Sequence, residues 1–211
     1  ELNTPMSGII GFSELLLSEI ENPNQREMAK IIYKSSKRLN ETLNSILDLS
    51  KLESNNLQFK YNSFDIVSLL QECKFAFIEN ANKKGIQFSV TSDQPKILVY
   101  SDQSIVHKVL CNIIDNSIKY TDKGEVNLHL SESAESALIS VSDTGIGIPQ
   151  ESLNQIFEPF RQGSEGLNRK FEGMGLGLSI TKKFIEVLGG KLKISSTPGI
   201  GTKVTIELPK K

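Results

Sequence analysis

Two glycine-rich segments constrain this chain more than any other part of its sequence. The first runs Asp143-Thr-Gly-Ile-Gly-Ile-Pro149, and after a polar stretch the second runs Gly173-Met-Gly-Leu-Gly-Leu-Ser179. In the first, glycines let the backbone approach a flat ligand, and the Asp143 carboxylate can accept a hydrogen bond from an exocyclic amine such as that of adenine. In the second, glycines lead into a helical apolar pattern, so backbone N–H groups converge on a helix N-terminus that suits phosphate. The pair predicts a nucleotide pocket with a lid, and ATP is the first ligand to test.

Neither segment is a Walker loop or the opening of a Rossmann unit, and either one alone would predict only a turn. A third segment strengthens the interpretation, because Asn112, Asn116 and Lys119 are spaced to share one helical face. Amide oxygens can complete the coordination of a magnesium ion that phosphates already hold, and a lysine adds positive charge. A solvated polar face is the alternative for this segment taken alone. Together the three segments predict one Mg-ATP site.

In their order and spacing these segments resemble the conserved boxes of bacterial-type sensor histidine kinases. The matching residues are 112–119 for the N box, 143–149 for the G1 box, 156–161 for the F box, 173–177 for the G2 box and 199–202 for the last glycine box. Glu1-Leu-Asn-Thr-Pro5 resembles the H box, which places a phosphoacceptor histidine immediately before the glutamate. That histidine is expected one residue upstream of Glu1. The resemblance spans essentially all 211 residues.

The resemblance implies an α+β chain with two parts. The first is a two-helix hairpin that forms a dimeric four-helix bundle, and the second is an α/β sandwich ATP-binding domain of the Bergerat type. The expected bounds are 1–53 for the dimerisation and phosphotransfer hairpin, 54–63 for a linker and 64–211 for the catalytic domain.

The hairpin also follows from the residues themselves. Helical spacing begins at Leu2, Glu21-Asn-Pro-Asn24 breaks it, and a second helix is expected to start near Asn24 or Gln25. Pro5 should kink the first helix. Apolar and small residues of the second helix advance by alternating steps of four and three, as in a coiled coil, and two helices cannot bury so broad a stripe. A homodimer is therefore predicted. The seam residues are Met28, Ile32, Ser35, Leu39, Thr42, Ile46 and Leu49.

The remaining pattern predicts a layer of helices on a mixed sheet. Helices are expected at about 65–84, 102–120 and 175–188, and the lid segment, about 161–174, is expected to be mobile without nucleotide. Strands are expected at about 86–91, 97–101, 125–131, 137–142, 191–196 and 203–208.

The resemblance assigns the binding roles. Asp143 reads adenine, Asn116 is the main magnesium ligand with Asn112 beside it, and Lys119 neutralises phosphate charge, while Gly175 and Gly177 present backbone donors. Arg161, Arg169 and Lys170 stabilise the transferring γ-phosphoryl group, or are solvated lid charges. The full expected ATP-binding set is Asn112, Asn116, Lys119, Tyr120, Asp143, Gly145, Gly147, Ile148, Phe160, Arg169, Lys170, Gly173, Gly175, Leu176, Gly177, Leu178 and Thr202.

Two residues near the N-terminus match the family's phosphotransfer positions. Glu1 would take the imidazole proton of the acceptor, and Thr4 would orient the water that dephosphorylates the partner, unless Glu1 is frayed and Thr4 bonds the helix backbone. Arg161 completes the expected catalytic set. The family passes the phosphoryl group to an aspartate of a response regulator receiver domain, and no segment of this chain resembles such a domain.

Charge and composition narrow the partners. The formal charge is −1, from 24 basic and 25 acidic side chains, so nothing recommends nucleic acid or direct membrane contact. No long apolar run is visible, and a cytoplasmic location is expected even if the parent protein is membrane-anchored. Cys73 and Cys111 are interpreted as buried thiols in a reducing compartment, not as a disulfide or metal site. His107 and His129 are interpreted as surface or packing residues without a Cys or His cluster.

Two alternatives stay open beside the kinase. The same nucleotide fold occurs in ATPases such as DNA gyrase and heat-shock chaperones, so fold alone does not define the reaction. In those ATPases the residue matching Asn112 is typically a glutamate that activates water, whereas an amide cannot act as a base. The other alternative is a kinase-inactive nucleotide-binding scaffold or phosphatase.

Overall fold

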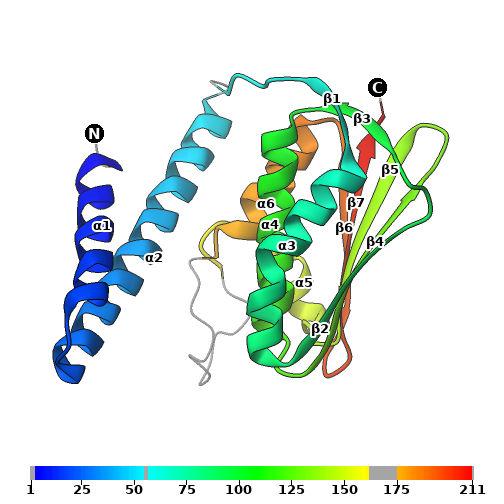
Figure 1. Ribbon diagram of the computed structural model, residues 1–211. Helices are drawn as coiled ribbons and strands as arrows, with labels where there is room; N and C mark the ends of the chain where they lie inside the picture. Colours follow the sequence, from blue (N-terminus) through cyan, green and yellow to red (C-terminus); the bar gives the residue numbers. More distant parts are fainter. Residues whose placement is uncertain (1–2, 55–56, 162–174, 211) are drawn as a thin grey trace. The chain divides into compact units, whose positions relative to one another are not determined.

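The structure is a computed structural model that describes residues 3–54, 57–161 and 175–210 (Figure 1). It divides into two compact units, Glu1–Asn55 and Asn56–Lys211, and each is described by itself. Within the described residues, no helix combines the length and the apolar character needed to cross a membrane.

The first unit is a helical hairpin of α1 (Asn3–Glu19) and α2 (Pro23–Glu53). Helix α2 begins slightly before the predicted start, because Asn22 is its N-cap and Pro23 occupies the first helical position. The Asn22 Oδ1 accepts from the N–H groups of Asn24 and Gln25 at 3.0 and 3.3 Å. Proline suits this position because its missing N–H would have no partner in the helix. The kink expected at Pro5 stays a prediction, since the carbonyl it would affect belongs to Glu1, outside the described residues.

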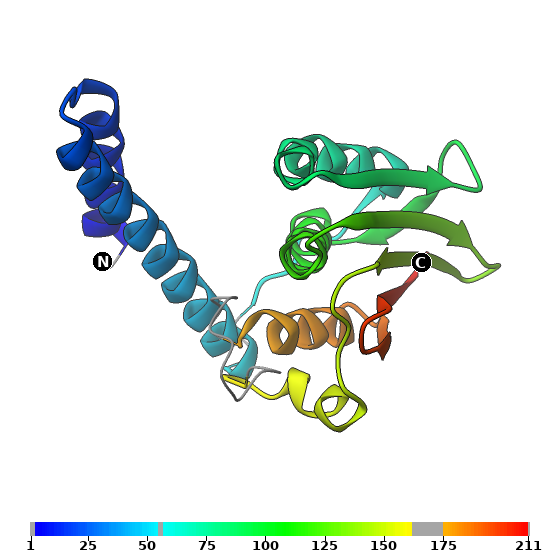
Figure 2. The same ribbon diagram turned by 90° about the horizontal axis from the view of Figure 1, so that it is seen from below.

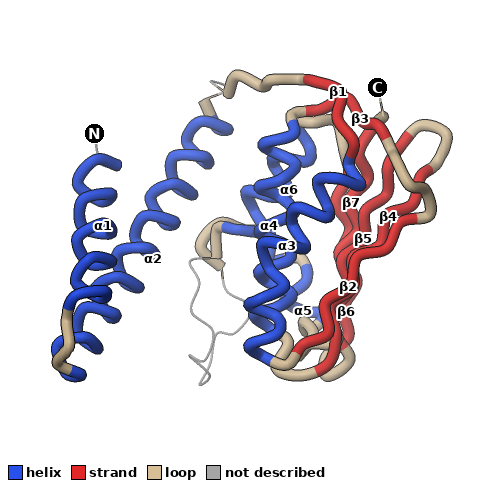
Figure 3. The backbone as a smooth tube through the Cα atoms, in the orientation of Figure 1, coloured by secondary structure: helices blue, strands red, loops and turns tan. Residues whose placement is uncertain are grey.

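The second unit contains a five-stranded mixed sheet with the strand order β2-β4-β5-β7-β6. Only β2 and β4 pair in parallel, and the other neighbours are antiparallel. Helices α3 (Ile66–Lys84), α4 (Gln103–Tyr120) and α6 (Gly177–Val187) cover one face of this sheet (Figures 2 and 3). The predicted layer of helices on a mixed sheet is thereby confirmed. The strands are β2 (Ile86–Ser92), β4 (Gly124–Glu132), β5 (Ser136–Asp143), β6 (Lys191–Thr197) and β7 (Gly201–Pro209).

Two helices of this unit begin where an aspartate side chain caps them. Asp65 caps α3 (Ile66–Lys84) and Asp102 caps α4 (Gln103–Tyr120), each accepting from N–H groups of the first turn. Helix α4 is the centre of the unit, because its apolar face lies buried against the sheet and neighbouring helices. Its buried residues are Val106, Val109, Leu110, Ile113, Ile114, Ser117 and Ile118. Two short elements, α5 (Gln150–Leu153) and η1 (Gln155–Phe157), precede α6 (Gly177–Val187).

A small antiparallel pair, β1 (Asn62–Asp65) with β3 (Leu98–Ser101), was not fully predicted. Its first strand starts inside the predicted linker, 54–63, and Asn62 lies opposite Ser101. Just before it, the Lys60 N–H donates to Asp102 Oδ2 at 2.7 Å. The end of the predicted linker is therefore hydrogen-bonded to the N-cap of α4. The sequence pattern missed β1 because a four-residue strand has too few positions to show a period.

Candidate functional site

Asp143 is the last residue of β5 and lies where three segments of the chain meet. Its Oδ1 accepts from the Gly145 N–H at 3.0 Å and from the Thr202 N–H at 3.2 Å. The Ser117 hydroxyl of α4 also donates to its carboxylate. Thr202 is opposite Asp143 in the β5–β7 register, so both the turn after β5 and the start of β7 are tied to one carboxylate.

The carboxylate of Asp143 is half-buried, and this affects its ionisation. Burial raises its pKa above the ordinary value, and the hydrogen bonds from Gly145, Ser117 and Thr202 offset only part of that effect. A perturbed acid at the end of a strand, beside a glycine turn, is typical of a binding site. The ionised carboxylate therefore suits a ligand with a hydrogen-bond donor and not a second anion.

The turn after Asp143 leaves no room for side chains at its glycines. A Cβ on Gly145 would lie 2.5 Å from the Tyr120 carbonyl oxygen and 2.9 Å from Asp143 Oδ1. Gly147 has a φ of +69°, and a Cβ there would collide with the Thr197 carbonyl. A hydrogen bond to β6 helps to hold the turn, since the Ile148 N–H donates to the Ser196 hydroxyl oxygen at 2.7 Å. Only glycine fits these two positions, because the turn packs against the protein's own backbone, and the predicted approach of a flat ligand stays a prediction.

Asn112 is oriented by a side chain of another helix. Its Nδ2 donates to Thr181 Oγ1 of α6 at 2.8 Å, and Thr181 is buried. A Cβ on Gly177 would lie 2.5 Å from Asn112 Oδ1. The amide oxygen therefore faces Gly177, the first residue of α6, while the amide nitrogen is hydrogen-bonded to Thr181. Asn116 lies one turn further along α4 and is half-buried.

The N-terminus of α6 has features of an anion site. Its N-cap position is Leu176, which is buried and provides no side-chain hydrogen bond to the first turn. The preceding Gly175 has a φ of +69°, and a Cβ there would collide with the Arg161 carbonyl. This explains why α6 begins at Gly177 and not at the predicted residue 175. The backbone donors of Gly177 and Leu178, at the start of α6, are the ones that suit phosphate.

The F-box segment is joined to the second glycine turn by its backbone. Phe160 N–H donates to the Gly175 carbonyl at 3.1 Å, and Phe160 has a φ of +66°, which is unusual for a residue with a side chain. Its ring is 61% exposed, so the aromatic side chain is available at the surface. The structure thus brings two predicted residues together although the intervening segment, 162–174, lies outside the description.

Arg161 interacts with side chains that precede it closely in the sequence. Its Nε lies 2.9 Å from Glu158 Oε2, and its NH1 donates to Gln155 Oε1 at 3.2 Å.

At the end of α4, the Lys119 ammonium lies 5.2 Å from the Tyr120 ring centroid. Burial raises the pKa of Tyr120, and Asp115 adds to that effect. Tyr120 also contacts the first glycine turn through its carbonyl, which accepts from the Ile146 N–H at 3.1 Å.

Other predicted residues belong to the hairpin and to the expected lid. Thr4 is an exposed residue in the first turn of α1. Glu1, Arg169, Lys170 and Gly173 lie outside the described residues, as does nearly all of the expected lid. Their roles stay predictions.

Three polar residues that shape the site were not singled out from the sequence. Ser117 and Thr181 are both buried, and Ser196 accepts from Ile148 N–H. Ser117 and Thr181 interrupt the apolar patterns of α4 and α6, and a buried polar side chain needs a partner. That interruption is the signal that could have identified them.

A second cluster corrects the interpretation of the cysteines and of His107. Cys73, His107 and Cys111 offer ligand atoms that all lie within 4.8 Å of one another, so His107 does have cysteines around it. Cys73 is buried, whereas Cys111 is only half-buried. The hydrogen bond with Cys111, together with burial, raises the pKa of the Cys73 thiol, and the same hydrogen bond lowers the pKa of Cys111. His129 agrees better with its prediction, since it lies at the surface with Nδ1 3.0 Å from Thr91 Oγ1.

Comparison with known families identifies the chain. Residues 101–211 match the histidine kinase-, DNA gyrase B- and HSP90-like ATPases, and residues 1–55 match the His Kinase A phospho-acceptor domain. The ATPase match covers more than half of the chain, and the phospho-acceptor domain directly precedes it. The chain therefore belongs to the sensor histidine kinases of two-component systems, and it carries the two domains of their kinase core.

Individual relatives agree with this family. The autoinducer 2 sensor kinase/phosphatase LuxQ of Vibrio cholerae is 36% identical over 214 residues, covering 99% of this chain and 25% of that protein. The hybrid signal transduction histidine kinase A of Dictyostelium discoideum is 39% identical over 222 residues, covering 99% of this chain and 10% of that protein. The chain thus spans a quarter or less of the length of these two relatives.

Solved structures give the same fold. Full-length ShkA in complex with AMPPNP superposes with a TM-score of 0.82 at 26% identity, over 98% of this chain and 43% of that one. Histidine kinase ThkA in complex with the response regulator TrrA gives a TM-score of 0.72 at 26% identity, over 98% of this chain and 58% of that one. The α+β architecture of a helical hairpin followed by an ATP-binding α/β domain is therefore confirmed.

Proposed function

We propose that this chain is an ATP-dependent protein histidine kinase core. It transfers the γ-phosphoryl group of ATP to a histidine immediately before Glu1 in the longer protein, and from there to an aspartate of a response regulator receiver domain. The observation that carries the proposal is that helix α4 contacts both parts of the site, through Ser117 bonded to Asp143 and through Asn112 at the α6 N-terminus, in a chain whose other unit is a phospho-acceptor domain.

The described residues divide the recognition of ATP between them. Asp143 is an acceptor held in place by two N–H groups, so its free lone pairs suit the exocyclic amine of adenine. Gly145 and Gly147 let the turn beside Asp143 pack closely against the backbone of Tyr120 and Thr197, which fixes the turn next to this carboxylate. The N-terminus of α6 supplies backbone donors for the phosphates, and Lys119 supplies positive charge. The AMPPNP bound to full-length ShkA supports ATP as the ligand of this unit.

The side-chain amide oxygens of Asn112 and Asn116 are the type of ligand that a hard cation prefers. Such an ion would be held between the protein and the phosphates of ATP. Because the Asn112 amide nitrogen donates a hydrogen bond to Thr181, the amide oxygen is directed to the start of α6, where phosphate is expected. When bound, Mg²⁺ neutralises phosphate charge and lowers the barrier to transfer of the γ-phosphoryl group. Asn116 is the main proposed ligand and Asn112 its neighbour.

The hairpin provides the acceptor side of the reaction. Glu1 takes the imidazole proton of the upstream histidine, which makes the ring a better nucleophile, and Thr4 positions water for dephosphorylation of the regulator. Arg161, Arg169 and Lys170 stabilise the transferring phosphoryl group once Arg161 leaves Glu158. The apolar stripe of the hairpin is the interface of a homodimer. The kinase core acts in the cytoplasm. The complex of ThkA with TrrA supports a receiver domain as partner.

Phosphorylation from γ-labelled ATP tests the reaction. A chain extended by a histidine before Glu1, with a few helical residues ahead of it, should form an adduct that is labile in acid and stable in base, as a phosphoramidate is. The chain that starts at Glu1 should bind ATP without forming this adduct. In the extended chain Glu1→Gln should slow adduct formation by about 10²- to 10⁴-fold. Thr4→Ala should spare it and impair dephosphorylation of the regulator.

The outcomes separate the alternatives. ATP hydrolysis without an adduct on the extended chain would favour an ATPase of the same fold. ATP binding with neither adduct nor hydrolysis would favour a kinase-inactive scaffold or phosphatase. Label on the chain that starts at Glu1 would place the acceptor elsewhere.

A further inference from the structure

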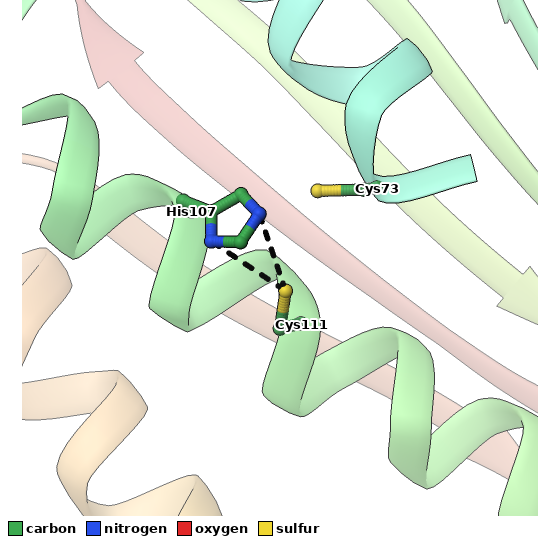
Figure 4. A group of neighbouring side chains, drawn as sticks. All are labelled: Cys73, His107 and Cys111. Carbon is green, nitrogen blue, oxygen red and sulfur yellow. Dashed lines mark hydrogen bonds between the residues drawn. The ribbon is translucent and has the colours of Figure 1, made fainter. Parts of the chain in front are cut away.

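Three potential metal ligands meet between helices α3 and α4. Cys73 comes from α3, while His107 and Cys111 are one turn apart on α4 (Figure 4). One ligand atom from each residue lies within 4.8 Å of the other two. Within the described residues this is the one such group of His, Cys, Asp or Glu side chains. We propose that Cys73, His107 and Cys111 bind one Zn²⁺ ion.

The Cys111–His107 distance already fits a zinc coordination sphere, and the Cys73 Sγ lies within 4.8 Å of both other ligand atoms. Sulfur at about 2.3 Å and nitrogen at about 2.0 Å from a tetrahedral zinc lie roughly 3.6 Å apart, and two such sulfurs lie roughly 3.8 Å apart. The Cys111 Sγ lies 3.7 Å from both Nδ1 and Nε2 of His107. A rotation of the imidazole ring aims either nitrogen at a shared ion. The spacing of four residues on one helix keeps these two ligands together.

The chemistry of the set selects the ion. Two cysteine thiolates and one imidazole are soft and borderline ligands. They suit Zn²⁺ and do not suit Mg²⁺ or Ca²⁺, which prefer oxygen ligands. Cys73 is fully buried, and His107 and Cys111 are half-buried. An ion therefore enters from the side of His107 and Cys111. Three protein ligands leave a fourth position for water on that side.

This site is separate from the nucleotide site although both use α4. Cys111 faces Cys73 on α3, whereas its neighbour Asn112 bonds Thr181 on α6. A bound ion would tie α3 to the helix that carries Asn112 and Asn116 without touching ATP. The expected primary effect is thus on the stability of the second unit.

Metal titration of the whole chain tests the proposal, after chelator treatment and in a thiol-free reductant. One equivalent of Zn²⁺ should bind per chain, and at free Zn²⁺ 100 times Kd the melting temperature should rise by about 5 to 10 °C. Co²⁺ should give the thiolate charge-transfer absorption of a tetrahedral site. Cys73→Ser, Cys111→Ser and His107→Ala should each weaken Zn²⁺ binding by more than about 100-fold, since even outer-shell partners contribute 10- to 100-fold.

Controls keep the test decisive even if the buried Cys73 variant fails to fold. His107→Ala changes a half-buried residue, and its metal-free melting temperature should match that of the parent chain. His129→Ala removes the chain's other histidine and should leave Zn²⁺ affinity unchanged. Unaltered Zn²⁺ affinity in His107→Ala and Cys111→Ser would overturn the proposal. So would binding of Cu⁺ without Zn²⁺, or a Cys73–Cys111 disulfide that forms readily in air in a chain that takes up no Zn²⁺ when reduced.

Discussion

The two units of this protein bury their apolar residues to very different extents. Helix α2 has 31 residues and three buried apolar ones, whereas α4 has 18 residues and six buried apolar ones. Large apolar side chains of the hairpin stay exposed, such as Met28 at 63% and Leu39 at 50%. The core of the ATP-binding unit is closed within one chain. The hairpin has an apolar surface that a second copy of itself would complete.

The largest expected effect separates the two units. Replacing Ile32 and Leu39 together with Glu should convert a dimer of the full chain into monomers, because each new carboxylate would have to be buried without a partner. ATP affinity should not change. Light scattering measures the mass, and calorimetry measures ATP binding. Lys34→Glu is the control, since it adds a carboxylate outside the seam. A dimer that survives the double change would place the interface elsewhere.

The next largest effect concerns nucleotide binding alone. Asp143→Asn should weaken ATP binding by roughly 10- to 150-fold, because losing a charge-assisted hydrogen bond costs about 1.5 to 3 kcal/mol. The dimer should remain intact. Asp102→Asn makes the same chemical change at the N-cap of α4 and should leave ATP affinity nearly unchanged. Calorimetry that shows equal ATP affinities for the two variants would remove Asp143 from the adenine site.

These two aspartates should also affect stability with opposite signs. Burial opposes ionisation of Asp102, but bonds from the Ser104 hydroxyl and from the Lys60, Ile105 and Ser104 N–H groups outweigh it and hold its pKa below the ordinary value. Its contribution is present above the unfolded pKa, about 3.9, and is lost as the pH falls through the folded pKa. Asp102→Asn should therefore cost about 1 to 3 kcal/mol at pH 7, and less below about pH 4.

Asp143 should behave in the reverse way because its pKa is raised. As the pH rises above the unfolded pKa, the unfolded chain ionises more readily than the folded one, so stability falls until the folded pKa is passed. Asp143→Asn should leave the ATP-free unit at least as stable at pH 7 as the parent. Urea unfolding of both variants at pH 7 and near pH 3 measures these differences. A large loss of stability in Asp143→Asn at pH 7 would make this residue structural.

The smallest effect is confined to the hairpin. Asn22→Ala removes the N-cap of α2 and should cost about 1 kcal/mol of hairpin stability, while Asn22→Asp keeps the cap and should be nearly neutral. Thermal unfolding followed by circular dichroism measures both. The ATP-binding unit should melt at an unchanged temperature, and a shift of its transition would mean that the two units unfold together.

The sequence by itself determined the features that depend on neighbouring residues. Asp65 as an N-cap, the glycine turn after Asp143 and the heptad of α2 were all readable, because caps, turns and helical faces are set by a few adjacent positions. The order of these segments was enough to predict the family and the α+β fold. The bonds that fix the site were not readable in this way.

Only the tertiary structure decided which distant residues meet. It paired β2 in parallel with β4, placed Thr181 against Asn112, and brought Cys73 to His107 and Cys111. The His107–Cys111 spacing was visible in the sequence, but the third ligand comes from another helix. Such contacts depend on how helices pack on a sheet. The spacing of residues along one segment predicts which of them share a face, but it does not predict which other segment that face will contact.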